Sequence, residues 1–312
     1  MKIPCASWLV DIPTYWIERE SIFPYCCAFV WDRSFLDDLK RLGFEHAHLL
    51  CLCTNPRIFR EISLSQDEST RFSCDVSFVG NFFYRFYQEC YLDKKSDPRI
   101  QAIIDEVIEL KNRDIFQDIP DLLNQVEQKW KYSLIFQNPE EKRYFVMSLE
   151  CARVACYRKQ IIESLKGMRL HLHICGNEEE CKMILGEDGS FEYLGRLNYH
   201  QDLPKLYNTT KVNLAINTSQ KTGINQRVLD VSACGSFILT DYREDQDILF
   251  ASGEIVDYKD ADDLRGKIEY FLNHPEERME ITRVIQKKVL AEHTYRHQME
   301  EVIGKMSQIF NL

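Results

Sequence analysis

Residues 222–245 read TGINQRVLDVSACGSFILTDYRED. The middle part of this stretch carries apolar residues at helical spacing, such as Leu229 and Ala233, which favours a helix with one buried face. Gly235 follows and is typical of a helix end. The run SFILT (236–240) has the composition of a buried strand. A helix that leads directly into a strand is the repeating unit of α/β proteins.

The same alternation extends from residue 76 to residue 273. Short β-type runs are separated by segments of helix length, such as 260–274, in which Leu264 and Ile268 are one helical turn apart. The runs that we expect to form strands are 76–79, 170–175, 191–194, 212–217, 236–240 and 254–258. This pattern predicts an α/β fold with a doubly wound parallel sheet, covered by helices on both faces.

The remaining segments suggest a second, smaller unit. We expect residues 1–70 to form a partial Rossmann-like lobe with three strands and the start of a linker. The polar tract 63–73 has the composition of an interdomain linker. Residues 71–291 form the larger lobe, and the helical pattern of about 82–168 predicts a long insertion between its first two strands. We expect the last helix, 292–312, to pack back on the smaller lobe.

Composition excludes several classes of protein. With 45% hydrophobic and 28% charged residues, the chain has an ordinary soluble composition. No apolar run reaches the ~20 residues that a bilayer requires, so we expect no transmembrane segment. The net charge of −10 argues against a nucleic-acid partner, and any anionic ligand must therefore be bound by local groups.

The twelve cysteines do not indicate disulfides. No signal peptide accompanies them and most lie in apolar runs, which is typical of free thiols in a cytoplasmic protein. His171, His173 and Cys175 alternate along one expected strand, with Cys181 nearby, and could in principle hold a metal. Such alternation is usually one face of a sheet, and no second ligand pair at zinc-finger spacing exists. We therefore expect no metal and no cofactor.

Candidate ligand-binding residues follow the expected strands. Open parallel sheets bind ligands at the carboxyl ends of their strands. Glycine lets a ligand approach the backbone there, and amides supply hydrogen-bond donors. The residues of this kind in the first three such loops are Gly80, Asn81, Gly176, Asn177, Gly195, Arg196, Asn198 and Tyr199.

The loop after the fourth strand has the strongest pattern. Thr222, Gly223 and the amides of Ile224 and Asn225 precede a helix N-terminus, which carries partial positive charge. This arrangement predicts a phosphate site. The chain contains no G-x-G-x-x-G after a strand and no G-x-x-x-x-G-K-[ST], so nicotinamide-binding and P-loop classes are disfavoured.

Two charged side chains follow in the same helix. Arg227 could add a bidentate contact to an anion, and Asp230 could accept hydrogen bonds from two vicinal ribose hydroxyls. Alternatively, Arg227 is solvated and Asp230 only complements the helix dipole. Spacing alone leaves both roles open.

Several segments together resemble the CgeB-type spore-maturation proteins of the glycosyltransferase group 1 set. They are 29–59, 75–81, 212–250 and 289–303. The resemblance implies a GT-B fold, in which a nucleotide-sugar donor is held mainly by the C-terminal lobe and the acceptor reacts in the cleft. It also implies transfer without a metal, because a helix dipole and basic side chains stabilise the diphosphate.

The resemblance further implies a role for each donor-binding residue. Asp230 would bind the ribose, Arg227 and the turn 222–225 would hold the diphosphate, and Gly195–Leu197 would border the base. Family members more often carry Glu at the position of Asp230. They also usually have additional strand–helix units before the segment that matches 5–13, so we expect an incomplete N-terminal lobe.

The leading hypothesis is a metal-independent, hexosyltransferase-type enzyme that transfers a sugar from a nucleotide-sugar donor. The acceptor, whether a glycan, a protein or a small molecule, is not identified by the sequence. The alternative is a truncated, non-catalytic protein that binds a nucleotide sugar or a partner. No catalytic residue is assigned. His200 could carry a proton in the cleft, but the favoured interpretation is that it is a solvated loop residue.

Overall fold

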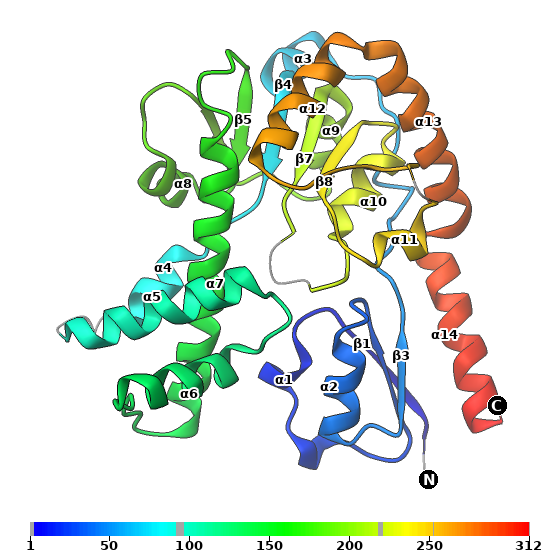
Figure 1. The fold of residues 1–312 in the computed structure, drawn as a ribbon. Coiled ribbons are helices and arrows are strands. Elements are labelled where there is room, and N and C mark those ends of the chain that lie inside the picture. Colours follow the sequence, from blue (N-terminus) through cyan, green and yellow to red (C-terminus); the bar gives the residue numbers. More distant parts are fainter. Residues whose placement is uncertain (1–2, 92–96, 218–220, 252, 312) are drawn as a thin grey trace.

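The computed structural model describes residues 3–91, 97–217, 221–251 and 253–311 (Figure 1). Its strands are β1 (Cys5–Leu9), β2 (Cys26–Val30), β3 (His46–Leu49), β4 (Cys74–Val79), β5 (Leu172–Cys175), β6 (Glu192–Gly195), β7 (Thr210–Ala215), β8 (Ile238–Asp241) and β9 (Val256–Tyr258). Its α-helices are α1 (Pro13–Trp16), α2 (Phe35–Leu42), α3 (Gln66–Phe72), α4 (Tyr84–Tyr91), α5 (Pro98–Arg113), α6 (Ile119–Trp130), α7 (Pro139–Glu163), α8 (Glu178–Leu185), α9 (Leu203–Thr209), α10 (Gln226–Ala233), α11 (Gln246–Leu249), α12 (Ala261–Asn273), α13 (Pro275–Glu292) and α14 (Tyr295–Phe310), and a 3₁₀ helix spans Arg19–Ser21.

The strands form two sheets, which we call the small and the large sheet. The small sheet has three strands in the order β1-β2-β3, and the large sheet has six in the order β6-β5-β4-β7-β8-β9. All these pairs are parallel, which confirms the predicted doubly wound sheet. Connections leave β4 and β7 in opposite directions, so a crevice forms where their carboxyl ends meet.

Helices cover both faces of the large sheet, which is why apolar residues of its central strands are buried on both sides. Leu239 of β8 packs in one cluster with Leu264 of α12. The preceding residue, Ile238, packs in a second cluster with Leu229 of α10. Because neighbours along a strand point to opposite faces, the two clusters lie on opposite sides of the sheet.

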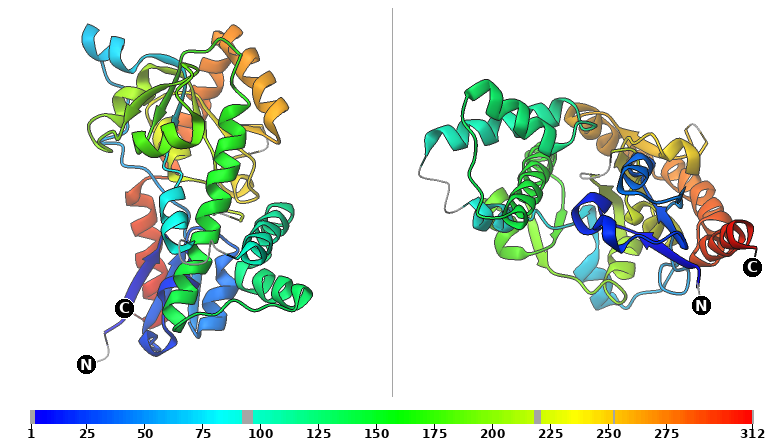
Figure 2. Two further views of the ribbon diagram at one scale, coloured as in Figure 1. Left: turned by 90° about the vertical axis from the view of Figure 1, so that its left-hand side faces the viewer. Right: turned by 90° about the horizontal axis from the view of Figure 1, so that it is seen from below.

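The segment between β4 and β5 is helical, as the sequence predicted, and comprises α4 to α7. Helix α7 begins where the Asn138 side chain accepts a hydrogen bond from the Glu141 amide at 2.8 Å, and Pro139 is the first helical residue. Phe145 of α7 packs with α5 and α6, whereas Ile162 packs against the large sheet. Helix α7 therefore anchors the insertion on the large sheet, as the left view of Figure 2 shows.

The small sheet packs against α2 and α14. Helix α2 ends at Gly43, whose φ of 113° favours glycine. The chain returns from the large sheet through α14, which runs alongside the small sheet (Figure 1). There Met306 contacts a cluster that contains Phe29 of β2 and Leu50.

The tract 63–73, predicted to be an interdomain linker, contains a short helix. Residues Gln66–Phe72 form α3, and Phe72 is buried. Ser65 and Glu68 form a capping box, in which the Ser65 hydroxyl accepts from the Glu68 amide and Glu68 accepts from the Ser65 amide. The sequence S-x-x-E carried this signal, although the polar composition suggested a loop.

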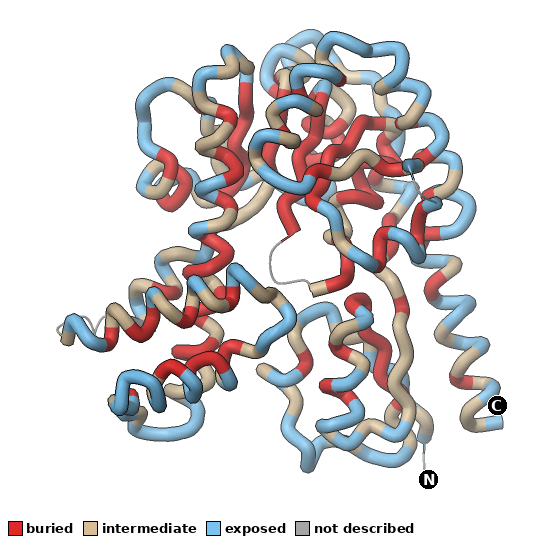
Figure 3. Tube along the Cα trace, in the orientation of Figure 1, coloured by how far each residue is buried: buried red, intermediate tan, exposed pale blue. Residues whose placement is uncertain are grey.

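Buried residues follow the strands of the large sheet and α7 (Figure 3). All twelve cysteines are free thiols. None of the described helices combines the length and the apolar character needed to cross a membrane.

The packing of α14 predicts that substitutions on its two faces differ in their effect on the free energy of unfolding. Met306 is 9% exposed in the small-sheet core, whereas Ile303 on the same helix is 65% exposed. We expect Met306→Ala to lower the free energy of unfolding by about 2–3 kcal/mol, because it removes buried atoms and leaves a cavity. Ile303→Ala should change it by less than about 0.5 kcal/mol. Urea denaturation followed by circular dichroism measures both, and equal effects would contradict the docking of α14.

Candidate functional site

A cavity of about 470 Å³ opens at the carboxyl ends of β4, β5 and β6. It lies at the crevice between β4 and β7, where doubly wound sheets bind their ligands. The predicted site residues that line it are Gly80, Asn81, Gly176, Arg196, Leu197, Asn225, Arg227 and Asp230. Segments far apart in the sequence are thus brought together as expected from their places after strands.

Gly80 and Gly176 approach each other closely beside this cavity. The Gly80 amide donates to the Cys175 carbonyl at 2.8 Å. A Cβ atom on Gly176 would lie 2.3 Å from the Gly80 carbonyl oxygen, so no side chain fits there. The Gly176 amide donates to the Gly195 carbonyl at 3.0 Å, and Gly195 itself lies outside the lining. These contacts hold the loops after β4, β5 and β6 against one another.

Asn81 and Asn177, both predicted to bind the ligand, form hydrogen bonds that hold neighbouring loops together. The Asn81 side-chain oxygen accepts from the Asn177 amide at 3.1 Å. Asn177 caps α8, where its side-chain oxygen accepts from the Glu180 amide at 3.2 Å, and it lies outside the cavity lining. The buried Glu180 in turn accepts from the Phe82 amide at 3.2 Å. Asn177 therefore fixes the loop that carries Gly176.

Arg227 is the strongest sign of an anionic ligand. Its Nε and Nη1 atoms are shielded from solvent and have no hydrogen-bond partner among the described residues. An unsatisfied buried donor costs about 1–3 kcal/mol, and more when it is charged. Arg227 also lines the cavity and is only partly buried, so an anion bound there could draw the guanidinium toward it and supply acceptors.

A second arginine, Arg158, contacts a residue that lines the cavity. Arg158 of α7 is buried and donates to the Asn81 carbonyl oxygen. Burial, and then the charge of Arg227, lower the pKa of Arg158 to about 9. An anion bound beside Arg227 would offset this repulsion. Sequence reasoning missed Arg158, because it comes from the insertion and no local motif marks it.

Asp230 faces the same cavity from α10. Its carboxylate accepts from the Thr54 hydroxyl at 2.7 Å and from the Tyr199 hydroxyl at 2.6 Å. Burial raises its pKa to about 6. Gln226 donates to the Tyr199 oxygen at 2.8 Å and so orients the phenol. Each carboxylate oxygen keeps a further lone pair, so Asp230 can still accept from a ligand hydroxyl.

The structure places Thr222–Ile224 outside the cavity lining. The Thr222 hydroxyl is 2.7 Å from an oxygen of Asp32 and 2.7 Å from an oxygen of Asp245, and it can donate to one of them at a time. Ile224 is part of the core, and a Cβ atom on Gly223 would lie only 3.0 Å from the Trp31 carbonyl oxygen. Two carboxylates beside Thr222 disfavour a phosphate there, contrary to the expectation from sequence.

The helix amides next to this turn are also partly occupied. The Asn225 amide donates to the Asn217 side chain at 2.8 Å, and the Arg227 amide donates to the Asn225 side chain at 2.9 Å. Asn225 is thus the N-cap of α10. The Arg227 side chain, rather than these two amides, supplies the free donors.

Residues 158–304 match the model of a protein family described as glycosyl transferase-like. The matched region contains Arg158, Arg227 and Asp230. A search of curated proteins gave no match.

Solved structures of glycosyltransferases share the architecture of the chain. Sucrose-phosphate synthase from Thermosynechococcus elongatus is 11% identical with a TM-score of 0.56, and the alignment covers 98% of this chain and 68% of that one. Anabaena HepE in complex with UDP-glucose is 9% identical with a TM-score of 0.57, and the alignment covers 98% of this chain and 72% of that one. The DNA-modifying enzyme β-glucosyltransferase is 10% identical with a TM-score of 0.51, and the alignment covers 98% of this chain and 74% of that one. The similarity shows that the chain has the GT-B fold, as predicted.

The raised pKa of Asp230 predicts how stability depends on pH. A carboxyl whose pKa rises from 3.8 to about 6 on folding binds its proton more tightly in the folded state. Its stabilising effect is complete below the unfolded pKa and is lost as the pH rises through the folded pKa. Asp230→Asn removes this dependence. The free energy of unfolding of the wild type, relative to the variant, should fall by roughly 2–3 kcal/mol between about pH 4 and about pH 7.

Urea denaturation at several pH values tests this difference. Asp67 is exposed on α3, so Asp67→Asn should leave the pH profile of stability close to that of the wild type. Parallel profiles for the wild type and Asp230→Asn would show that Asp230 ionises with an ordinary pKa.

Proposed function

We propose that this protein is a glycosyltransferase that transfers a sugar from a nucleotide-sugar donor to an acceptor. The observation that carries the proposal is Arg227, a guanidinium with unpaired donors that lines a cavity at the switch point of a GT-B fold. The match to a glycosyl transferase-like family and the UDP-glucose held by the Anabaena relative support it.

In the proposed complex the donor diphosphate lies against Arg227. A guanidinium binds phosphate oxygens through two parallel hydrogen bonds. Its charge would stabilise the leaving nucleoside diphosphate as the glycosidic bond breaks, and buried Arg158 would add to the positive potential behind it. These two cations would take the place of a divalent metal, so the proposed transfer is metal-independent.

Asp230 would accept hydrogen bonds from the ribose hydroxyls, and Arg196 and Leu197 would border the base, with Gly80, Asn81, Gly176 and Asn225 completing the walls. The other predicted residues have positioning roles in this proposal. Asn177 and Gly195 fix the neighbouring loops, and Thr222–Ile224 hold the start of α10 against the small sheet.

The proposal extends to the organisation of the chain. Residues 1–70 would form the acceptor lobe, 71–291 the donor lobe with the insertion at about 82–168, and 292–312 the helix that joins them. The chain would be a cytoplasmic member of the CgeB-type group, supported by its free thiols and by the segments that resemble that group.

One observation favours the non-catalytic alternative. Among the described residues that line the cavity, Asp230 is the only carboxylate and there is no histidine. Asp230 is already hydrogen-bonded to Thr54 and Tyr199, so no general base is evident on the donor side. Release of UDP from UDP-glucose, with water or an added glycan as acceptor, distinguishes the alternatives: a non-catalytic protein binds the donor and releases none.

The role of Arg227 is tested by calorimetric titration with UDP, GDP and ADP in the presence of EDTA. We expect at least one nucleotide to bind without metal, and Arg227→Ala to lose about 1.5–3 kcal/mol, or roughly 10- to 150-fold in affinity, because a charge-assisted contact is removed. Arg296 is exposed on α14, where it pairs with Glu300, so Arg296→Ala is the matched control. Equal affinities for the wild type and Arg227→Ala would contradict the anion site.

The ribose contact is tested by comparing two ligands. Asp230→Asn keeps the shape of the side chain but loses its charge. We expect its affinity for UDP to fall by roughly 1–2 kcal/mol, whereas binding of pyrophosphate, which has no ribose, should barely change. A purely structural Asp230 would leave both affinities unchanged, and an equal loss for both ligands would indicate a distorted cavity instead.

A further inference from the structure

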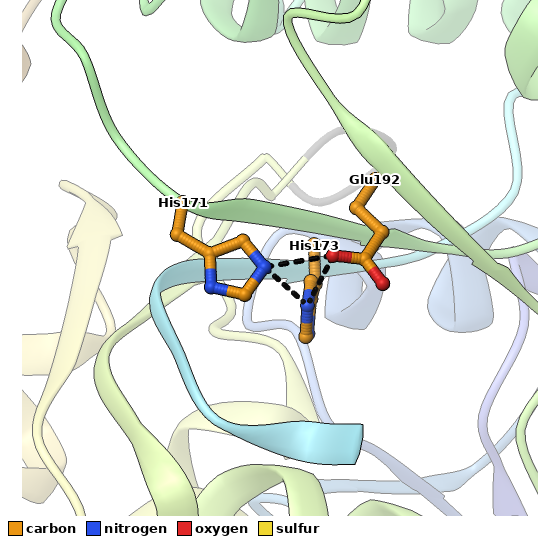
Figure 4. A group of neighbouring side chains, drawn as sticks. All are labelled: His171, His173 and Glu192. Carbon is orange, nitrogen blue, oxygen red and sulfur yellow. Dashed lines mark hydrogen bonds and ion pairs between the residues drawn. The ribbon is translucent and has the colours of Figure 1, made fainter. Parts of the chain in front are cut away.

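A group of potential metal ligands lies at the opposite end of the large sheet from the cavity. His171 immediately precedes β5, His173 lies in β5, and Glu192 is the first residue of β6. The strands pair in parallel with His173 opposite Glu192, and all three side chains lie on the same side of them (Figure 4). Cys175, at the other end of β5, lines the cavity.

The ligand atoms converge closely. His171 Nε2 is 2.7 Å from Glu192 Oε2, His173 Nε2 is 3.2 Å from the same oxygen, and the two nitrogens are 3.0 Å apart. The imidazole rings are nearly perpendicular, at 86°. Each neutral ring nitrogen offers either one proton or one lone pair. If both nitrogens carried protons toward the carboxylate, the two N–H groups would face each other at short range.

We propose that His171, His173 and Glu192 bind a zinc dication. Zinc binds imidazole nitrogen and carboxylate oxygen at about 2.0–2.2 Å in tetrahedral geometry, which sets ligand atoms about 3.3–3.5 Å apart. The observed triangle needs only a slight expansion to become one face of that tetrahedron. A bound dication would replace the hydrogen bonds among these three groups with three coordination bonds.

The surroundings indicate the character of the site. His173 is buried, whereas the side chains of His171 and Glu192 are about half exposed, so the fourth coordination position is open to solvent. The Nδ1 atom of His173 has no partner among the described residues, so this ligand lacks the outer hydrogen bond that strengthens many zinc sites. We therefore expect moderate, micromolar affinity, and a stabilising link between β5 and the edge strand β6.

The two cysteines that the sequence places near these histidines do not join them in the structure. Cys175 is at the far end of the strand, and neither it nor Cys181 is among the ligand atoms that converge here. Glu192 was overlooked because its position opposite His173 is set by strand pairing, which no local spacing reveals.

Zinc binding by the purified protein, stripped of metal, tests the proposal. The Sγ atoms of Cys5 and Cys26 are 3.1 Å apart and could also bind zinc, so the titrations use the Cys5→Ser/Cys26→Ser background. We expect equimolar zinc in calorimetry and elemental analysis, and a higher melting temperature with zinc. His171→Asn and Glu192→Gln, both at exposed positions, should each weaken binding by more than about tenfold, because each removes a ligand.

The matched control is His274→Asn, which changes an exposed histidine on a different part of the surface and should not alter zinc binding. Cobalt absorption in the visible range gives an independent readout of tetrahedral coordination. The proposal is overturned if zinc binds the His171→Asn/Glu192→Gln double variant as tightly as the parent protein, or if the parent protein binds no zinc. Nucleotide binding should be the same with and without zinc, so this outcome is separate from the proposed transferase function.

Discussion

The arrangement of the site depends on a buried hydrogen-bonded contact between the two sheets. Asp32, just after β2, accepts from the amides of Lys221 and Thr222, at 2.9 and 3.2 Å. Burial would raise the pKa of Asp32, but hydrogen bonds from Ser34 and Thr222 lower it, so the group is held as a carboxylate. Buried charge is tolerated only where such donors compensate it. The contact therefore fixes the loop before α10 to the small sheet.

A second contact ties α10 itself to the connection between the two sheets. Thr54 lies on the connection from the small to the large sheet, and its hydroxyl bonds to Asp230. The Thr54 amide donates to the His293 carbonyl, and the Thr54 carbonyl accepts from the Tyr295 amide, where the chain turns into α14. Both connections between the sheets thus meet beside Asp230. A ligand bound to α10 would be sensitive to the relative position of the two sheets.

The fold was largely predictable because its signals are local. The strands of the large sheet are apolar runs, and the start of α7 is marked by Asn138 and Pro139. Gly80 and Gly176 were identifiable because they follow such runs directly. Helix α3 was missed because its polar composition outweighed its capping box.

The site was less predictable because its partners are distant in the sequence. Thr222 looked like a phosphate-binding residue, but its partner Asp32 is 190 residues away and redirects it toward the small sheet. Arg158 approaches the cavity from an insertion whose packing the sequence does not specify. A spacing pattern identifies which loops meet at the end of a sheet, whereas the pairing of polar side chains depends on the completed tertiary structure.

The two ends of the large sheet suit ligands of opposite charge. At the carboxyl end, glycines bring the loops together and Arg227 has donors without partners, so this end is suited to an anion. At the amino end of β5, imidazole and carboxylate groups converge, so that end is suited to a cation. At the carboxyl end the unliganded protein carries buried donors without partners among the described residues, a cost that packing elsewhere must offset. Because a ligand at either end would bind only the folded state, its binding would add directly to the stability of the same sheet.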